Sequence, residues 1–180
     1  MKGKTQKLVF CALFAALTAA GAFFRITFAF SSITLQFLFT ALSGLLLGPL
    51  WGAVSQLVYV LLGLAGLPVF ASGGGISYLL QPSCGFVLAL PLTAAVIAWV
   101  SRGSRRPGRT VGACFAGLAA LYAVGLSYMA LILNVYMGKG MNLWQIAMAG
   151  MIPYLPGDCV KIAVCAWLCT KLPERFLKNG

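Results

Sequence analysis

An acidic and a basic side chain lie three positions apart near the end of an apolar chain, in the stretch PYLPGDCVK over residues 153–161. Asp158 is one of only two acidic residues, and Lys161 follows at a spacing that places both side chains on one face of a helix. A carboxylate and an ammonium group together can bind a ligand that has both hydrogen-bond donors and acceptors. The same pair could instead be a structural ion pair. Catalysis would need a third titratable member, which the sequence does not offer, so we predict no catalytic residues.

The elements that hold this pair are predicted to be helices inside a lipid bilayer. The 180 residues are 61% hydrophobic and 8% charged, with a mean hydropathy of +0.97, whereas soluble domains carry about 25% charged residues. Uncharged runs cover residues 8–24, 26–101, 110–138 and 140–157, and a spanning helix needs about 20 apolar residues. We therefore predict an all-α integral membrane protein, a single domain over residues 1–180 with about six transmembrane helices.

Glycine and proline mark the expected ends of these helices. Gly48 and Pro49 form a helix-stop signal, and Pro68, a run of three glycines and Pro82 predict an outer loop over about 67–83. The helices are expected over about 8–24, 34–47, 50–66, 84–101, 110–137 and 156–172.

The net charge of +11 follows the predicted topology. Ten of the 13 basic residues fall before the first helix, in a loop over 101–109, or after the last helix: Lys2, Lys4, Lys7, Arg102, Arg105, Arg106, Arg109, Lys171, Arg175 and Lys178. With six helices all three places lie on one side, which the positive-inside rule makes cytoplasmic. Both termini are therefore predicted to be cytoplasmic, in a multi-pass protein of the cell membrane. This distribution argues against a nucleic-acid partner.

Metal and cofactor chemistry is not indicated. The chain has no histidine, and its six cysteines fall in or beside apolar runs without the spacing of a zinc site. We predict that they are small apolar packing residues, with no metal site, no nucleotide-binding motif and no cofactor.

The unusual polar residues and the glycine run of the outer loop converge on the outer end of the predicted bundle. They are Asp158, Lys161, Asn134, Tyr78, Gln81, Ser72, Arg25 and Gln36, together with Gly73 and Gly74. We predict that they form a substrate-binding pocket that opens outward. The amides of Asn134 and Gln36 also suit helix–helix bonding, Arg25 suits an interfacial position, and the glycines suit plain turn chemistry.

Small residues recur at every fourth position of the first helix, at Ala12, Ala16 and Ala20. Such a stripe lets another helix approach closely. Packing within the chain and docking onto a partner subunit both fit this pattern.

Several sequence blocks resemble one membrane-protein family. They are ITLQ (33–36), LLLGPLWGA (45–53), GLPVF (66–70), SGGGISYLLQPSCGF (72–86), LILNVYMGK (131–139) and PYLPGDCVK (153–161). In order and spacing they resemble the BioY family, the biotin-specific S components of energy-coupling factor (ECF) transporters. The loop differs from the common family pattern GGxGG…GPTGGY.

The resemblance implies a six-helix bundle that captures biotin outside the cell. It also implies partners, namely a transmembrane coupling subunit and two cytoplasmic ATPase subunits, with Ala12, Ala16 and Ala20 as the docking face. Asp158 would accept hydrogen bonds from the ureido N–H groups of biotin, and Lys161 would donate to the ureido oxygen or the carboxylate. Tyr78, Phe70 and Trp144 would pack on the bicyclic ring. An S component for another vitamin such as thiamine, a membrane-embedded enzyme that uses Asp158 and Lys161, and a purely structural subunit remain alternatives.

Overall fold

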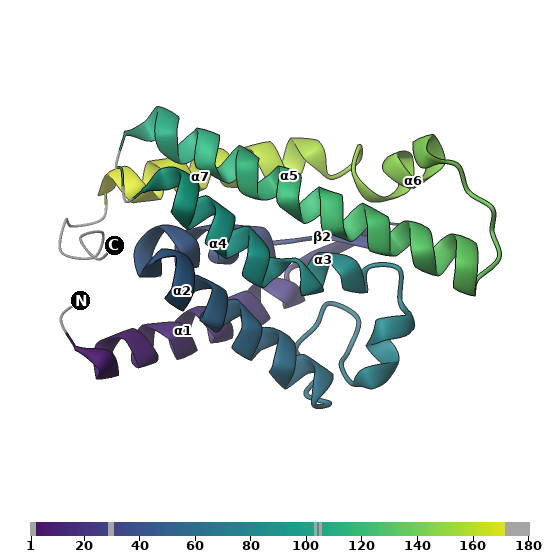
Figure 1. The fold of residues 1–180 in the computed structure, drawn as a ribbon, viewed down its shortest axis with the longest axis horizontal. Helices are drawn as coiled ribbons and strands as arrows, with labels where there is room; N and C mark the ends of the chain where they lie inside the picture. Colours follow the sequence, from purple (N-terminus) through teal and green to yellow (C-terminus); the bar gives the residue numbers. More distant parts are fainter. Residues whose placement is uncertain (1–2, 29–30, 103, 105, 172–180) are drawn as a thin grey trace.

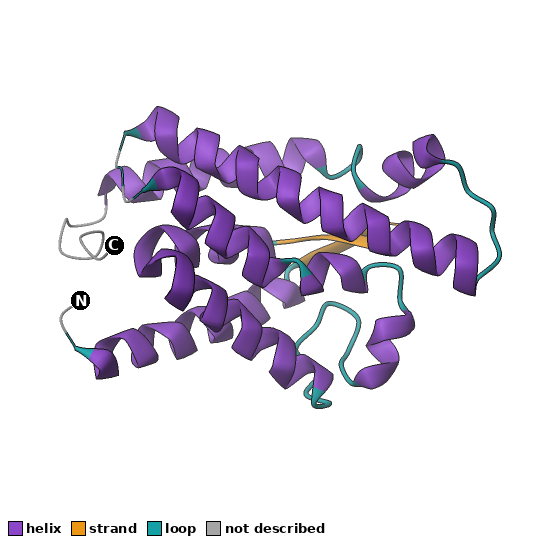
Figure 2. Ribbon diagram, in the orientation of Figure 1, coloured by secondary structure: helices purple, strands orange, loops and turns teal. Residues whose placement is uncertain are grey.

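The computed structural model describes residues 3–28, 31–102, 104 and 106–171. These residues form an elongated helical bundle with one short β-hairpin (Figures 1 and 2). The elements are α1 (Lys4–Phe23), β1 (Arg25–Phe28), β2 (Ser31–Thr34), α2 (Gln36–Leu64), the 3-10 helix η1 (Ile76–Leu80), α3 (Cys84–Leu88), α4 (Leu90–Ser101), α5 (Pro107–Leu131), the π-helix η2 (Ile132–Tyr136), α6 (Leu143–Gly150) and α7 (Leu155–Lys171).

The helix α2 is two antiparallel halves. Gly48 has a φ of 80° and a ψ of 179°, values outside the helical region, and Pro49 follows it. The Thr40 hydroxyl donates to the Gln56 amide oxygen at 3.0 Å, although 16 residues of continuous helix would separate these positions by about 24 Å. The chain therefore reverses at Gly48, as the predicted helices 34–47 and 50–66 require.

The buried side-chain amide of Gln56 links the two halves of α2 to each other and to α1 through hydrogen bonds. The Gln56 oxygen accepts from Thr18 and Thr40, and its nitrogen donates to Ser43 and Ser55. All five side chains are fully buried. A side-chain amide has two donor hydrogens and two acceptor lone pairs, so Gln56 has its full complement of partners without water.

The short helices η1 and α6 lie outside the predicted helices, and the other helices follow the predicted ranges closely. α3 and α4 meet at Ala89, whose backbone is helical, and together cover the predicted 84–101. α5 continues into η2, so that the predicted 110–137 is observed as 107–136. Among the described residues, three helices are long and apolar enough to span a membrane, namely α1, the α5–η2 helix and α2 taken over its full length, and the α6–α7 pair, bent by 50°, would add a fourth. Because α2 reverses at Gly48, it enters this count as a hairpin and not as one straight span.

The connection between the first two predicted helices contains strands. β1 and β2 pair antiparallel, with Arg25 opposite Thr34 and Phe28 opposite Ser31. Each strand carries two β-branched residues, Ile26 and Thr27 in β1 and Ile33 and Thr34 in β2, which favour extended backbone. The pairing satisfies backbone groups that a plain loop would leave open.

The basic segments gather at one end of the bundle. Figure 1 shows the start of α1, the end of α7 and the connection from α4 to α5 at the same end, whereas η1 and α6 lie toward the other. This is the arrangement that the charge pattern predicts. Lys2, Arg105, Arg175 and Lys178 lie outside the described residues.

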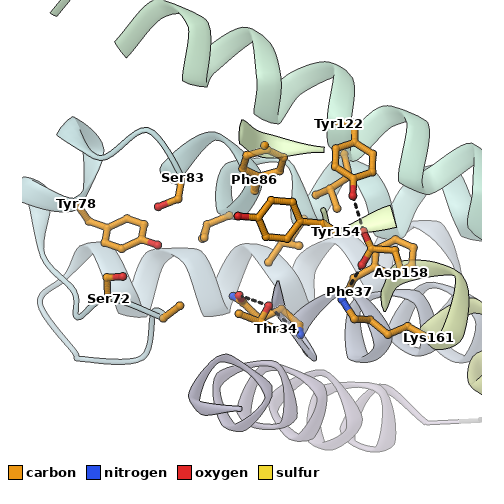
Figure 3. A pocket seen from close by; sticks show the side chains of 16 residues that line it. Thr34, Phe37, Ser72, Tyr78, Ser83, Phe86, Tyr122, Tyr154, Asp158 and Lys161 are labelled. Carbon is orange, nitrogen blue, oxygen red and sulfur yellow. Dashed lines mark hydrogen bonds and ion pairs between the residues drawn. The ribbon is translucent and has the colours of Figure 1, made fainter. Parts of the chain in front are cut away.

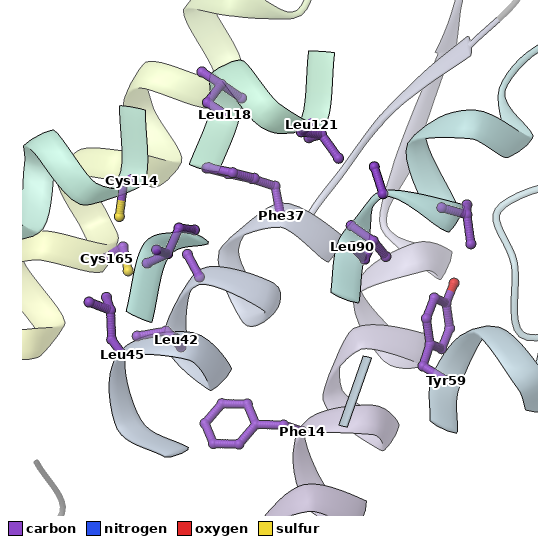
Figure 4. Close-up of a cluster of buried hydrophobic side chains, with 14 of the residues drawn as sticks. Phe14, Phe37, Leu42, Leu45, Tyr59, Leu90, Cys114, Leu118, Leu121 and Cys165 are labelled. Atoms are coloured by element: carbon purple, nitrogen blue, oxygen red, sulfur yellow. The ribbon is translucent and has the colours of Figure 1, made fainter. Parts of the chain in front are cut away.

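The core joins α1, α2, α4, α5 and α7 through aliphatic and aromatic side chains (Figure 4). Five cysteines are buried and Cys159 is exposed. Cys114 and Cys165 lie beside each other in this core, in agreement with their predicted packing role.

Candidate functional site

The pocket lies in the half of the bundle that holds the connection between α2 and α3. The empty space in it is about 670 Å³ with the open mouth included. It is lined by Thr34, Gln36, Phe37, Ala71, Ser72, Tyr78, Ser83, Phe86, Val87, Leu90, Leu121, Tyr122, Gly150, Tyr154, Asp158 and Lys161.

An ion pair forms one end of this pocket (Figure 3). The Lys161 ammonium lies 2.6 Å from Asp158 Oδ1, and the Tyr122 hydroxyl donates to Asp158 Oδ2 at 2.6 Å. Asp158 and Lys161 are 5% and 8% exposed. Asp158 lies in the first turn of α7, where the helix dipole favours an anion.

This end keeps hydrogen-bonding capacity for a ligand. A carboxylate offers about four lone-pair positions and an ammonium group three N–H donors. Among the described residues, Tyr122 and Lys161 occupy two positions on Asp158, so two remain. Lys161 uses one N–H on Asp158, so two remain there as well. The pair can therefore bind a group that presents N–H donors beside an oxygen acceptor.

The opposite end of the pocket is polar but uncharged. Ser72, Tyr78 and Ser83 lie there, away from Asp158 and Lys161 (Figure 3). Burial raises the pKa of the Tyr78 phenol, so that its hydroxyl stays protonated and can donate a hydrogen bond.

Between the two ends the wall is mainly apolar and aromatic. Phe37, Leu90 and Leu121 line it from three helices, and Phe86 and Tyr154 lie in the middle of the view in Figure 3. The Phe86 ring meets the Tyr122 ring edge-on, with centroids 6.1 Å apart. The site thus suits an elongated ligand with an apolar middle and two polar ends.

A sequence profile of the BioY family matches residues 1–178. The chain belongs to the BioY family. A probable biotin transporter BioY from Lysinibacillus sphaericus is 40% identical over 175 residues, which cover 96% of this chain and 89% of that protein. A probable biotin transporter BioY from Pyrococcus horikoshii is 36% identical, with 96% of this chain and 98% of that protein covered.

The fold of this BioY-family protein is also found in a solved structure. A crystal structure of the S component for biotin from an ECF-type ABC transporter superposes with a TM-score of 0.81 at 24% identity, covering 98% of this chain and 93% of that chain. The likeness shows an S-component fold. The chain is therefore a multi-pass membrane protein.

Five of the ten predicted binding residues of this BioY-family chain line the pocket: Asp158, Lys161, Gln36, Ser72 and Tyr78. They come from two helices and the segment between α2 and α3, and the fold brings them to one cavity. Their contact with a ligand stays a prediction.

The other five predicted residues do not line the pocket: Asn134, Gln81, Gly73, Gly74 and Arg25. Asn134 exchanges two hydrogen bonds with the backbone of Met141, at 2.9 and 2.6 Å, and so fixes the turn after η2. The Gln81 carbonyl accepts from the Cys84 amide at the start of α3.

The two glycines build a turn. Gly73 has a φ of +110° and pairs with Phe70 through two backbone hydrogen bonds. A Cβ on Gly74 would lie 2.1 Å from the Leu67 carbonyl oxygen. Arg25 is exposed at the start of β1.

Two aromatic residues expected to pack on a ligand also lie elsewhere. Phe70 is buried between Tyr59 and Tyr78, with ring centroids 5.5 and 4.6 Å away. Trp144 is exposed on α6.

Sequence reasoning missed several wall residues, notably Tyr122, Tyr154, Phe86 and Thr34. A tyrosine within an apolar helix resembles an ordinary core or interfacial aromatic. The one available signal for Tyr122 was that a buried phenol needs a hydrogen-bond partner, and Asp158 was a candidate acceptor.

Proposed function

We propose that this chain captures biotin from the outside and acts as the substrate-binding S component of an ECF-type ABC transporter. The observation that carries the proposal is the buried Asp158–Lys161 pair, which Tyr122 orients at one end of the pocket. The names of the BioY-family relatives and of the solved S component support biotin as the ligand.

The proposed fit begins at the charged end. The ureido ring of biotin has two N–H donors and one carbonyl oxygen. Asp158 has two lone-pair positions left for the donors, and Lys161 has N–H groups left for an oxygen. A ligand that lacks one of these groups would leave an N–H donor or a lone pair of this buried ion pair without a hydrogen bond, so the pair should discriminate against analogues.

The other end of the pocket suits the biotin carboxylate. Ser72, Tyr78 and Ser83 each carry a hydroxyl that can donate to an anion. The apolar wall between the ends suits the thiophane ring and the aliphatic tail.

The proposed partners are a transmembrane coupling subunit and two cytoplasmic ATPase subunits. Ala12, Ala16 and Ala20 are all exposed on one side of α1, which supports docking of another helix rather than packing within this chain. The basic ends of α1, α5 and α7 would then face the cytoplasm, with the pocket opening outward. Energy would come from the ATPases, so that no catalytic step is assigned to this chain.

The test is calorimetric titration of the purified, lipid-reconstituted chain with biotin and with a panel of other vitamins, thiamine included. We expect one-to-one binding of biotin alone, lost in Asp158→Asn. The control is Thr93→Val, which removes a buried hydroxyl that donates to the Ala89 carbonyl, outside the pocket, and should bind as the parent does.

Absence of biotin binding by a folded parent would refute the assignment, and binding of another vitamin instead would redirect it. Biotin binding that survives Asp158→Asn would return the ion pair to a structural role.

A further inference from the structure

A chain of hydrogen bonds leads from the pocket wall to the segment between α2 and α3. The Thr34 hydroxyl donates to the Gln36 amide oxygen at 2.8 Å, and the Gln36 amide nitrogen donates to the Tyr59 hydroxyl at 2.7 Å. The Tyr59 hydroxyl donates in turn to the Val69 carbonyl oxygen at 3.0 Å. Thr34 and Gln36 line the pocket, whereas Tyr59 does not.

All three bonds point the same way, from the pocket toward Val69. Each group accepts from the previous group and donates to the next, and such chains strengthen cooperatively in a medium of low dielectric constant. Tyr59 is 1% exposed, so water does not compete for its hydroxyl. A ligand that fills the pocket would exclude water from Thr34 and Gln36, and the lower local dielectric constant would strengthen the chain up to Val69.

Val69 belongs to the connection between α2 and α3, residues 65–83, which we call the glycine loop. This loop supplies Ala71, Ser72, Tyr78 and Ser83 to the pocket wall. Its position therefore decides whether the uncharged end of the pocket is formed.

The same tyrosine also supports the loop through its ring. Phe70 packs edge-on against Tyr59 and lies against Gly63, where an added Cβ would meet the Phe70 ring at 2.1 Å. Phe70 then contacts Tyr78 of the pocket wall. A Tyr59→Phe substitution keeps this ring packing and removes only the hydroxyl.

A second tyrosine holds the glycine loop without touching the pocket. The Tyr128 hydroxyl on α5 donates to the Leu79 carbonyl at 2.6 Å, and Tyr128 does not line the cavity. Tyr59 and Tyr128 thus make the same phenol-to-carbonyl bond to one loop. Of the two, Tyr59 is also bonded to the pocket side chain Gln36, whereas Tyr128 interacts with Cys84, which does not line the pocket. The chain therefore contains its own matched control.

We propose that Tyr59 is a positioning residue that links the pocket side chain Gln36 to the closed position of the glycine loop, so that a bound ligand slows opening of that loop. The link between Gln36 and the loop follows from the hydrogen bonds alone. Only the identity of the ligand rests on the proposed function.

The experiment is hydrogen–deuterium exchange of the full chain in lipid nanodiscs, with and without biotin. Peptides over 66–75 report on the amides of Phe70, Gly73 and Gly75, which are hydrogen-bonded within the loop and to Gly63. Peptides over 76–83 report on the amides of Tyr78 and Gln81. The variants are Tyr59→Phe, Tyr128→Phe, Gln36→Met and the Gln36→Met/Tyr59→Phe double variant.

Without ligand, Gln36→Met and Tyr59→Phe should each raise exchange over 66–75. The double variant should exchange no faster than Tyr59→Phe alone, because both changes break one chain. Tyr128→Phe should instead raise exchange over 76–83. Additive effects, or unchanged exchange over 66–75 in Tyr59→Phe, would overturn the proposal whatever the ligand is.

With biotin, exchange over 66–75 should fall in the parent and in Tyr128→Phe but not in Tyr59→Phe. The dissociation rate constant of biotin should be about fivefold higher for Tyr59→Phe than for the parent, because the variant lacks one neutral hydrogen bond. If Tyr59→Phe and Tyr128→Phe change hydrogen exchange over 66–75 and the rate of biotin dissociation equally, Tyr59 has only a structural role and the proposal is overturned. A folded parent that binds no biotin would refute the proposed function, and the ligand-free comparison would still decide the role of Tyr59.

Discussion

Removal of one member of the buried ion pair should separate its contribution to stability from its contribution to binding. In Lys161→Met the side chain keeps its length but loses the ammonium group that lies 2.6 Å from Asp158 Oδ1. The carboxylate of Asp158, only 5% exposed, would keep the Tyr122 hydroxyl as its one side-chain partner among the described residues.

The expected loss can be estimated from this geometry. Removal of one partner of a buried pair costs about 3–5 kcal/mol. The lower figure applies here because the open pocket lets water reach the remaining carboxylate. A loss of about 3 kcal/mol corresponds to a fall of about 6–12 °C in Tm for a chain of this length.

The double variant Asp158→Asn/Lys161→Met provides the comparison. It removes both charges and keeps an oxygen at position 158 that can accept from Tyr122. Its free energy of unfolding should return to within about 1 kcal/mol of the parent value, because an uncharged replacement of a buried pair is often neutral. Biotin binding should stay lost in both variants.

Thermal unfolding in nanodiscs, followed by the fluorescence of the four tryptophans, measures the first quantity, and biotin titration measures the second. If Lys161→Met unfolds at the same temperature as the parent, the buried Asp158 carboxylate does not depend on the Lys161 ammonium group for its stability. If the double variant is as unstable as Lys161→Met, the loss arises from packing rather than from an unpaired charge.

Three further substitutions test other parts of the structure. Tyr122→Phe should weaken biotin binding about tenfold with the fold retained, because the charged oxygen it orients loses a hydrogen bond; unchanged affinity by calorimetry would contradict this. Gly63→Ala should displace Phe70 from its packing position and raise hydrogen exchange over residues 66–75, and normal exchange there would show that the ring can shift without consequence. Ala16→Leu should leave biotin binding intact but abolish uptake in cells that supply the coupling subunits. Ala119→Leu, which changes another exposed alanine, on α5, should leave both binding and uptake intact. Equal uptake by the two variants would contradict a docking role of α1.

The features that sequence predicted well depend on local rules. Gly48 followed by Pro49 is a helix-stop signal that depends only on neighbouring residues, so the end of the helix there could be predicted without knowledge of packing. Asp158 and Lys161 share a helix face by spacing alone, and the structure confirms that they are paired.

The features that sequence missed depend on long-range partners. Asn134 was expected in the pocket, but the π-turn after α5 directs its amide to the backbone of Met141. Tyr122 became part of the site because α5 packs beside α7, which no pattern within α5 reveals. The strands β1 and β2 are four residues each, too short for periodicity to separate them from a loop.

The reversal at Gly48 also bears on how the chain enters the membrane. The halves of α2 on either side of it, residues 36–47 and 49–64, are both shorter than the roughly 20 residues that an independent span requires. Each half also carries hydroxyl or amide groups, among them Ser43 and Gln56, whose partners lie on the other half. Alone in hydrocarbon, either half would expose these groups to lipid, where an unpaired polar group costs several kcal/mol. We therefore expect the insertion machinery to pass α2 into the bilayer as a preformed hairpin, in one step rather than two.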